Sequence, residues 1–194
     1  MVLSALWVLG GYLSGSVPYG LFVVRAFAGK DVRAEGSGNI GATNVARVAG
    51  PQLGVLVLVL DALKGLLPVL AARVLVPEEP WLHAGVGLAA FLGHCFPVWL
   101  RFEGGKGVAT ALGVLLVLLP WAALSGFAVY AVIFAIWRVS SIGSLVGALT
   151  AVAVGAFTAA AWAYGALAAI FLALIVFTHR ANIGRLLRKE EGRL

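Results

Sequence analysis

The chain has 194 residues, of which 62% are hydrophobic and only 11% are charged, and its mean hydropathy is +1.03. Soluble domains carry roughly 25% charged residues, so this composition excludes a soluble globular protein and predicts an all-α protein that crosses a membrane several times. A formal charge of +6 is too small to indicate nucleic-acid binding, and the single cysteine excludes an intrachain disulfide.

The apolar segments predict about seven spans in one integral membrane domain that covers residues 1–194. The first span, Val2–Arg25, contains Pro18, which frees a backbone carbonyl and kinks the helix. No basic region precedes it and no small-residue cleavage signal follows, so we expect this helix to be retained rather than removed as a signal peptide. The other spans are expected at Gln52–Val76, Trp81–Leu100, Val108–Leu119, Trp121–Trp137, Leu145–Trp162 and Ala163–Phe177.

Basic residues predict the orientation of these spans, because cytoplasmic loops carry an excess of Lys and Arg. With the N-terminus outside, the loops Lys30–Arg47 and Arg101–Lys106 and the one at Arg138 lie in the cytoplasm, as does a basic tail that begins at His179. This topology places every polar, glycine-rich segment on the cytoplasmic face, where together they could form one site.

The first polar segment, Arg33–Arg47, contains three glycines, two asparagines, a serine and a threonine between two flanking arginines. Glycine permits positive φ, successive N–H groups in such a turn form an anion-binding nest, and arginine has the fork geometry that suits phosphate. An ordinary interhelical loop is the alternative, but it would need only two or three such turn residues. We therefore expect phosphate binding by Gly36, Ser37, Gly38, Asn39, Gly41, Thr43, Asn44 and Arg47.

A second polar segment, Gly104-Gly105-Lys106-Gly107, leads directly into an apolar helix that contains Thr110. Amides at a helix N-terminus bind anions, and a lysine there adds a full positive charge. We therefore expect phosphate binding by Gly104, Gly105, Lys106, Gly107 and Thr110. The spacing is not that of a Walker A motif, so the signal depends on this being the second such loop on the same face.

Two further polar segments lie on that face. In Arg138–Ser144, the arginine could contact lipid headgroups and Ser144 could be a helix N-cap or a substrate ligand. His179 and Asn182 share a helical face if the last helix continues past Phe177. The later basic residues of the tail are more typical of lipid-headgroup binding.

Three of the ionisable residues within the predicted spans are candidates for the site. Asp61 and Lys64, three residues apart, either neutralise each other or belong to a functional site. His94 is either a general base or phosphate donor, or a hydrogen-bonded histidine at the membrane interface. The sequence has no Ser-His-Asp set, no His-x4-Asp acyltransferase signature and no cluster with metal-ligand spacing, so we expect neither metal nor cofactor. Chemistry at such a cationic, amide-rich site should depend on positioning and charge stabilisation.

These segments resemble the motifs of the bacterial acyl-phosphate-dependent glycerol-3-phosphate acyltransferases. The resemblance extends over essentially the whole chain and is carried by Asp31–Arg47, Asp61–Gly65, Gly93–Thr110, Arg138–Ser144 and His179–Leu186. It implies a seven-helix enzyme of the bacterial inner membrane, active on the cytoplasmic face. Such an enzyme transfers an acyl group from acyl phosphate to the 1-hydroxyl of sn-glycerol 3-phosphate, giving lysophosphatidic acid and phosphate in phospholipid biosynthesis.

The expected partners are the substrates acyl phosphate and glycerol 3-phosphate together with membrane lipid, with no nucleic acid and no obligate protein partner, so that the chain acts as a monomer. We expect the first polar loop to hold the acyl phosphate head, with the tail in a groove open to lipid. The proton of the attacking hydroxyl could pass to the substrate phosphate or to His94. The catalytic residues are expected to be Ser37, Arg47, His94, Lys106, Ser144, His179 and Asn182.

A small membrane transporter for an anionic phosphorylated metabolite is the alternative function, because glycine-broken helices at cationic sites also occur in transporters. Transporters, however, often show internal repeats and bind their substrate near the midplane of the bilayer. The polar segments of this chain gather at one face instead, and no repeat is evident.

Overall fold

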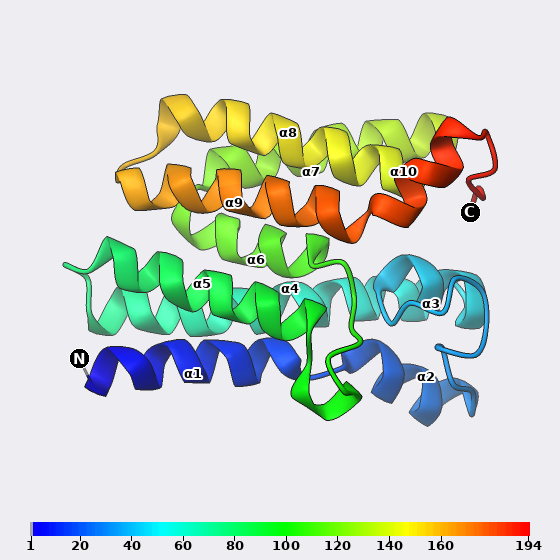
Figure 1. Cartoon of the computed structure of the whole chain (residues 1–194), viewed down its shortest axis with the longest axis horizontal. Coiled ribbons are helices and arrows are strands. Elements are labelled where there is room, and N and C mark those ends of the chain that lie inside the picture. Colours follow the sequence, from blue (N-terminus) through cyan, green and yellow to red (C-terminus); the bar gives the residue numbers. More distant parts are fainter. Residues whose placement is uncertain (1) are drawn as a thin grey trace.

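The computed structural model describes residues 2–194, and within these residues every regular element is a helix (Figure 1). The predicted all-α class is therefore confirmed. The elements are α1 (Val2–Ser16), α2 (Tyr19–Ala28), α3 (Ala42–Ala49), α4 (Pro51–Leu75), α5 (Pro80–Cys95), a 3-10 turn η1 (Val98–Leu100), α6 (Val108–Leu118), α7 (Pro120–Trp137), α8 (Ser140–Thr158), α9 (Trp162–Thr178) and α10 (Arg180–Leu187).

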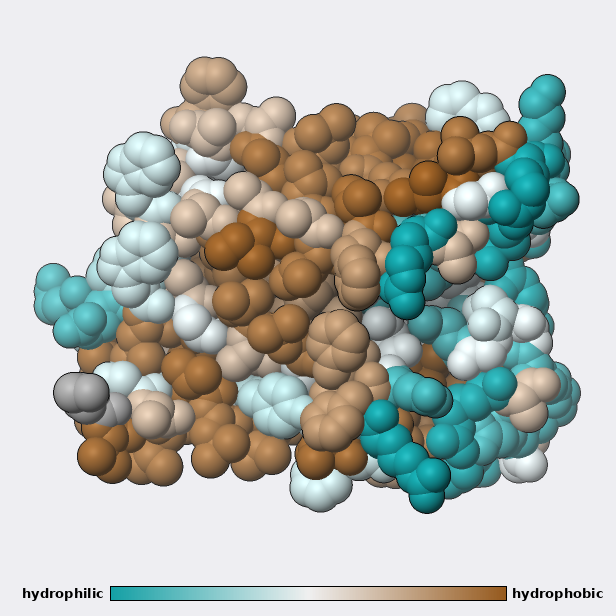
Figure 2. Space-filling view, in the orientation of Figure 1, coloured by the Kyte–Doolittle hydropathy of each residue, from teal (hydrophilic) through white to brown (hydrophobic). Residues whose placement is uncertain are grey.

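Five helical segments in residues 2–194 are long and apolar enough to cross a membrane, or six if α9 and α10, which meet at a 60° bend, form one span. The predicted count of about seven would also require α6 to cross, although its 11 residues are fewer than the roughly 17 that a span needs. The surface agrees with a membrane protein, because Figure 2 shows a broad hydrophobic region and hydrophilic residues concentrated at the end near α3 and α10.

The helices form two groups with α6 between them (Figure 1). One group contains α1, α4 and α5, which pack against one another, and the other contains α7, α8 and α9. Glycines allow the closest approaches, since a Cβ at Gly113 of α6 would lie 1.9 Å from the Ala62 carbonyl oxygen of α4. Gly126 of α7 and Gly147 of α8 face each other in the same way. Small residues at such contacts let membrane helices pack through their backbones.

The first predicted helix is divided at Pro18, and its second part continues to Ala28. Proline has no N–H group and its ring crowds the preceding turn, so the regular hydrogen-bond ladder cannot pass through it. The Lys64 ammonium group donates a hydrogen bond to the Val17 carbonyl at this break, over 2.8 Å. The predicted kink is therefore a complete break that a side chain from α4 stabilises.

Three element boundaries differ from those expected from the sequence. Residues 42–49, predicted to be loop, form the amphipathic helix α3, which buries Val45. The third predicted span extends to Leu100 as expected, but its α-helix ends at Cys95, because Pro97 cannot continue the helix, and the turn η1 completes the span. Ser140–Ser144 form the first turns of α8 rather than a loop, so Ser144 is not an N-cap; that position belongs to Val139.

Candidate functional site

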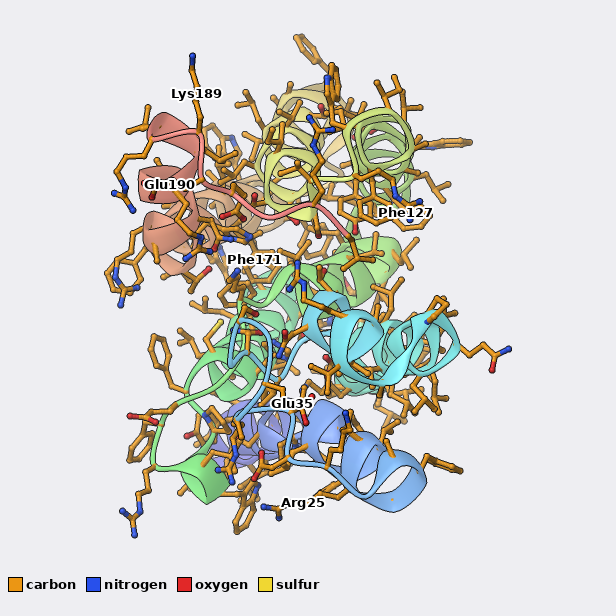
Figure 3. All side chains as sticks on the ribbon, turned by 90° about the vertical axis from the view of Figure 1, so that its right-hand side faces the viewer. Arg25, Glu35, Phe127, Phe171, Lys189 and Glu190 are labelled. Carbon is orange, nitrogen blue, oxygen red and sulfur yellow. The ribbon has the colours of Figure 1, made fainter. Side chains whose placement is uncertain are left out.

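A cavity of about 890 Å³ extends from the polar end of the molecule into the space between the two helix groups. Figure 3 views this end directly and shows Phe171 between the C-terminal tail, which carries Glu190, and the first polar loop, which carries Glu35. The polar wall of the cavity includes Gly36, Ser37, Asn39, Gly41, Thr43, Asn44, Arg47, His94, Lys106, Gly107, Ser144, His179 and Asn182.

The rest of the cavity is an apolar arm that follows α6, α7, α8 and α9. Its wall includes Leu112, Leu115, Ala123, Gly126, Phe127, Ala148, Ala151, Ala168 and Phe171. On α8 the arm extends from Ser144 to Ala151, which is about 10 Å along the helix axis. One turn beyond Ala151, Gly155 is buried next to Leu119, Ala122 and Ala168 and no longer lines the cavity, so the arm ends there.

The Asn44 side chain, only 2% exposed, organises the first polar loop. Its Oδ1 accepts a hydrogen bond from the Ser37 amide over 2.8 Å. Its Nδ2 donates to the carbonyl oxygens of Val32, Glu35 and Asn39 over 3.0–3.1 Å. The loop itself therefore engages both ends of the amide, and Asn44 shapes the loop that carries Ser37.

Positive φ is required at two glycines of this loop, Gly36 (+61°) and Gly38 (+70°). A Cβ at Gly36 would also lie 2.2 Å from Asn44 Oδ1, so any side chain there would displace the organising amide. The amides of Gly38 and Gly41 donate to the Glu35 carbonyl and to Asn39 Oδ1, respectively. These amides are already hydrogen-bonded within the loop, so they do not form the free amide nest expected from the sequence. The loop presents mainly side chains to the cavity instead.

At the second polar loop, the two leading glycines pack against the end of α5. The Gly104 amide donates to the Cys95 carbonyl (3.1 Å) and the Gly105 amide to the His94 carbonyl (3.0 Å). Gly38, Gly104, Gly105 and the fully buried Thr110 do not line the cavity, in contrast to their predicted role. They lie behind its wall, whereas Lys106 and Gly107 are part of it.

Lys106 is the central cation of the site. Thr178 Oγ1 donates to the Lys106 carbonyl over 3.1 Å, which ties this backbone to the end of α9. Within residues 2–194 no carboxylate lies within 4 Å of the ammonium group. Partial burial lowers the pKa of Lys106 to about 8, the nearby Arg185 and Arg47 act in the same direction, and Glu191 opposes them. An anion in the cavity would restore the charged form.

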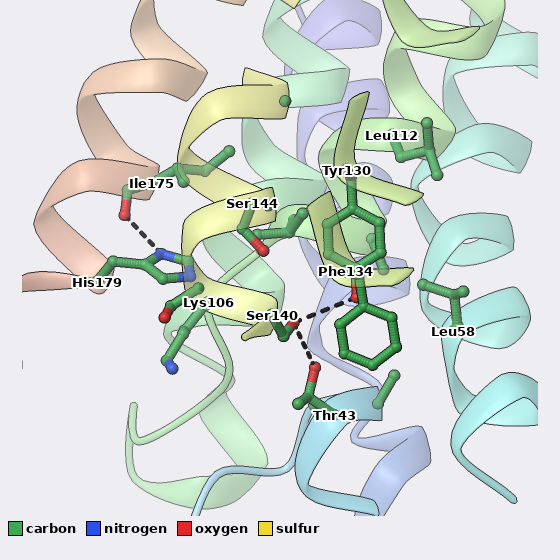
Figure 4. Close-up of a pocket in the computed structure, with 18 of the residues that line it drawn as sticks. Thr43, Leu58, Lys106, Leu112, Tyr130, Phe134, Ser140, Ser144, Ile175 and His179 are labelled. Atoms are coloured by element: carbon green, nitrogen blue, oxygen red, sulfur yellow. Dashed lines mark hydrogen bonds between the residues drawn. The ribbon is translucent and has the colours of Figure 1, made fainter. Parts of the chain in front are cut away.

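The bend between α9 and α10 brings His179 and Asn182 to the same wall, where both are buried (2% and 5% exposed). His179 Nδ1 lies 2.8 Å from the Ile175 carbonyl oxygen. A carbonyl only accepts, so Nδ1 carries the hydrogen and Nε2 is the ring nitrogen left for a ligand. Figure 4 shows His179, Lys106 and Ser144 on one side of the cavity, with Tyr130 and Phe134 across from them.

Ser140 connects the two helix groups beside this site. Its hydroxyl lies 2.9 Å from Thr43 Oγ1 at the start of α3 and 3.2 Å from the Tyr130 hydroxyl of α7 (Figure 4). The sequence did not indicate this chain of three hydroxyls, because Tyr130 lies in an apolar helix and Ser140 in a segment predicted to be loop.

Glu191 in the C-terminal tail is a second residue that the sequence did not indicate. Its carboxylate accepts hydrogen bonds from Ser141 Oγ (2.8 Å), Asn182 Nδ2 (2.5 Å) and Arg185 Nε (2.6 Å). Burial alone would raise the pKa of Glu191, but these hydrogen bonds outweigh burial and hold the pKa below its ordinary value. The only signal in the sequence was the adjacent pair Glu190 and Glu191 in a tail whose other charged residues are basic.

His94 lies at the base of the cavity, 3% exposed, with its Nδ1 3.6 Å from Asp61 Oδ1. Asp61 in turn forms an ion pair with Lys64 over 2.8 Å. These three ionisable side chains are therefore one buried cluster, and His94 lies in the last turn of α5, next to the second polar loop.

Residues 5–189 match the family model described as glycerol-3-phosphate acyltransferase. The chain belongs to the glycerol-3-phosphate acyltransferase family. It is 59% identical over 186 residues to the glycerol-3-phosphate acyltransferase of Myxococcus xanthus strain DK1622, covering 96% of this chain and 97% of that protein. The corresponding protein of Anaeromyxobacter sp. strain K is 51% identical and covers 100% of this chain and 98% of its own length.

Two solved structures agree with this acyltransferase membership. The crystal structure of PlsY, an integral membrane glycerol 3-phosphate acyltransferase, in its glycerol 3-phosphate form superposes with a TM-score of 0.93 at 41% identity, covering 98% of this chain and 95% of that one. Its lysophosphatidic acid form gives a TM-score of 0.91 at 39% identity. The fold and the acyltransferase activity expected from the motifs are confirmed by these matches.

Within this acyltransferase fold, all seven residues predicted to be catalytic line one cavity, although they come from five separate segments of the chain. They are Ser37, Arg47, His94, Lys106, Ser144, His179 and Asn182. Their individual roles remain predictions, and the site also contains the cavity-lining Ser140, Tyr130 and Glu191.

Proposed function

We propose that this chain transfers a fatty acyl group from acyl phosphate to the 1-hydroxyl of sn-glycerol 3-phosphate, releasing lysophosphatidic acid and phosphate. The observation that carries the proposal is the single cavity that joins a cationic wall to an apolar arm. The donor combines a phosphate head with an acyl tail, and the acceptor is a small phosphate ester. The glycerol 3-phosphate and lysophosphatidic acid forms of the similar PlsY support the same substrate and product.

In this proposal the acyl phosphate head lies against the first polar loop, near Ser37 and Thr43. Its tail follows the apolar arm towards Ala151, where small residues leave room for a chain. Glycerol 3-phosphate lies against the opposite wall, where it is oriented by Arg47, Lys106, Ser144, His179 and Asn182.

Transfer is direct. The 1-hydroxyl oxygen attacks the acyl carbon, the bond from this carbon to the phosphate oxygen breaks, and the phosphate leaves with the electron pair. Acyl phosphate is already an activated anhydride, so no protein nucleophile is needed, and cations such as Lys106 stabilise the negative charge that develops. The hydroxyl proton passes to a phosphate oxygen of the substrate, which balances the reaction.

The activity can be tested with purified protein in detergent, supplied with acyl phosphate and radiolabelled glycerol 3-phosphate. We expect radiolabelled lysophosphatidic acid to form with acyl phosphate and not with acyl-CoA. Lys106→Ala should reduce turnover by at least about 100-fold, because it removes the central charge. Lys30→Ala is the matched control, since Lys30 is exposed and pairs with Glu35 away from the cavity wall. A folded protein that forms no product would refute the acyltransferase proposal.

The route of the proton can be tested separately with His94→Gln. If the substrate phosphate takes the proton, this variant should mainly raise KM for glycerol 3-phosphate and change kcat by no more than about 10-fold. A loss of several orders of magnitude in kcat, with glycerol 3-phosphate binding intact, would instead make His94 the base.

We also propose that residues 1–194 act as one monomeric domain in the bacterial inner membrane, with the cavity facing the cytoplasm. The native Cys95 is buried, so introduced cysteines can report topology. An impermeant maleimide should label Glu78→Cys in intact spheroplasts and should label Glu35→Cys only after permeabilisation. The reverse pattern would invert the proposed orientation.

A further inference from the structure

The fold carries two full charges inside a membrane-spanning helix. Asp61 and Lys64 of α4 are 2% and 3% exposed, and their carboxylate and ammonium groups lie 2.8 Å apart. Charges in a span are costly and usually serve a function. Stability alone explains the pair poorly, because apolar residues of similar volume often replace a buried ion pair without loss of stability.

Lys64 fixes one end of this pair to the break in the first span. Its ammonium group donates to the Val17 carbonyl over 2.8 Å, and its own carbonyl accepts a hydrogen bond from Ser14 Oγ over 2.8 Å. Leu21 N–H, which would bond the Val17 carbonyl in a continuous helix, bonds the Pro18 carbonyl instead. The position of α4 relative to the break is therefore fixed by two separate hydrogen bonds.

The Asp61 oxygen that pairs with Lys64 also faces the end of α5. This oxygen, Oδ1, lies 3.6 Å from His94 Nδ1. The opposite side of the His94 ring packs directly on Gly105, where a Cβ would lie only 1.9 Å from Nε2. The Gly105 amide also donates to the His94 carbonyl over 3.0 Å. The residue after Gly105 is Lys106. The orientation of the His94 ring therefore affects the position of the backbone from which the Lys106 side chain extends.

We propose that the Asp61–Lys64 pair positions Lys106 for glycerol 3-phosphate, acting through His94 and Gly105. Lys64 anchors Asp61 to the helix break, Asp61 orients the His94 ring, and the ring supports the backbone from which Lys106 extends into the cavity. Asp61 borders the base of the cavity beside His94, whereas Lys64 lies behind the wall. Both are positioning residues in this proposal, because they act on the acceptor through His94 and Gly105. The inference rests on the proposed function, because it assumes that Lys106 binds the phosphate of the acceptor.

The test replaces the pair with apolar residues of similar size in the double variant Asp61→Leu/Lys64→Met. We expect its Tm in detergent to stay close to the native value, because both charges are removed together and neither is left buried without its partner. We expect kcat/KM for glycerol 3-phosphate to fall between about 10- and 100-fold, mainly through KM, since a misplacement of about 1 Å has effects of this size. KM for acyl phosphate should change by less than about twofold.

Tyr164→Phe is the matched control, because it removes a buried hydrogen bond to His83 and neither of these residues lines the cavity. It should lower Tm and leave both KM values unchanged. If the double variant does not fold, Asp61→Asn keeps the shape of the side chain and an oxygen for Lys64, removes the negative charge that Lys64 and His94 share, and should raise the same KM. A folded variant with native KM for glycerol 3-phosphate would overturn the proposal, and so would failure of both variants to fold.

The two proposals fail in different ways. If the native protein forms no lysophosphatidic acid, the proposed function fails, and the increase in Tm caused by glycerol 3-phosphate becomes the measurement. That increase should be smaller in the Asp61 variants than in the native protein and unchanged in Tyr164→Phe. An equal increase in all of them would refute the positioning role.

Discussion

Raising the pH above about 8 should remove the charge of Lys106 and weaken the capture of glycerol 3-phosphate. Burial disfavours the ammonium form and lowers the pKa of Lys106 from 10.5 to about 8. The cation is therefore present below this pH and is lost as the pH rises through it. One pH unit above the pKa, roughly one tenth of the protein still carries the charge, so kcat/KM should fall about 10-fold per unit.

A bound phosphate dianion stabilises the ammonium form and raises the pKa of Lys106 in the complex, so kcat should change less than kcat/KM. Initial rates of lysophosphatidic acid formation at several glycerol 3-phosphate concentrations, between about pH 6.5 and 9.5, would separate the two. Lys106→Arg should flatten the alkaline limb, since arginine stays charged over this range, whereas Lys30→Arg should retain it. If the alkaline decrease in kcat/KM persists in Lys106→Arg, Lys106 is not the group whose titration causes it.

Three further substitutions follow from the geometry. Ala151→Phe should fill the apolar arm and shift the preferred donor to shorter acyl chains. Ala153→Phe, on the exposed side of the same helix, is the control and should leave the chain-length preference unchanged. If the two variants show equal preferences, the acyl tail lies elsewhere. Glu191→Ala should lower stability by about 2–4 kcal/mol, measured by thermal unfolding in detergent, because three donors lose a charged acceptor. Gly36→Ala should cost about 1–3 kcal/mol in backbone strain, displace the Asn44 amide and raise KM for acyl phosphate; a native KM would argue against that loop as the donor site.

The polar loops were predictable because their signals are local. Runs of apolar residues predict helices wherever they occur, and the glycines and prolines between them predict turns from their own backbone preferences. The sequence was less informative where a residue's role depends on a distant partner. Asn44 was predicted to bind phosphate, yet it holds the carbonyls of Val32, Glu35 and Asn39. The leading glycines of the second loop were predicted to present free amides, yet these amides close onto the end of α5.

By itself, the sequence determined the α-helical membrane class, the approximate positions of the spans and many of the residues that line the cavity's polar wall, although not Ser140, Tyr130 or Glu191. Hydropathy and side-chain chemistry are properties of each segment, so they can be read without knowing its neighbours. Only the tertiary structure decided that Asp61 meets His94, that Glu191 meets Asn182, and that an apolar arm continues from the polar wall. These features depend on which helices approach closely, and that is set by glycine contacts between segments far apart in the chain, such as Gly15 with Ala90 and Gly113 with Ala62.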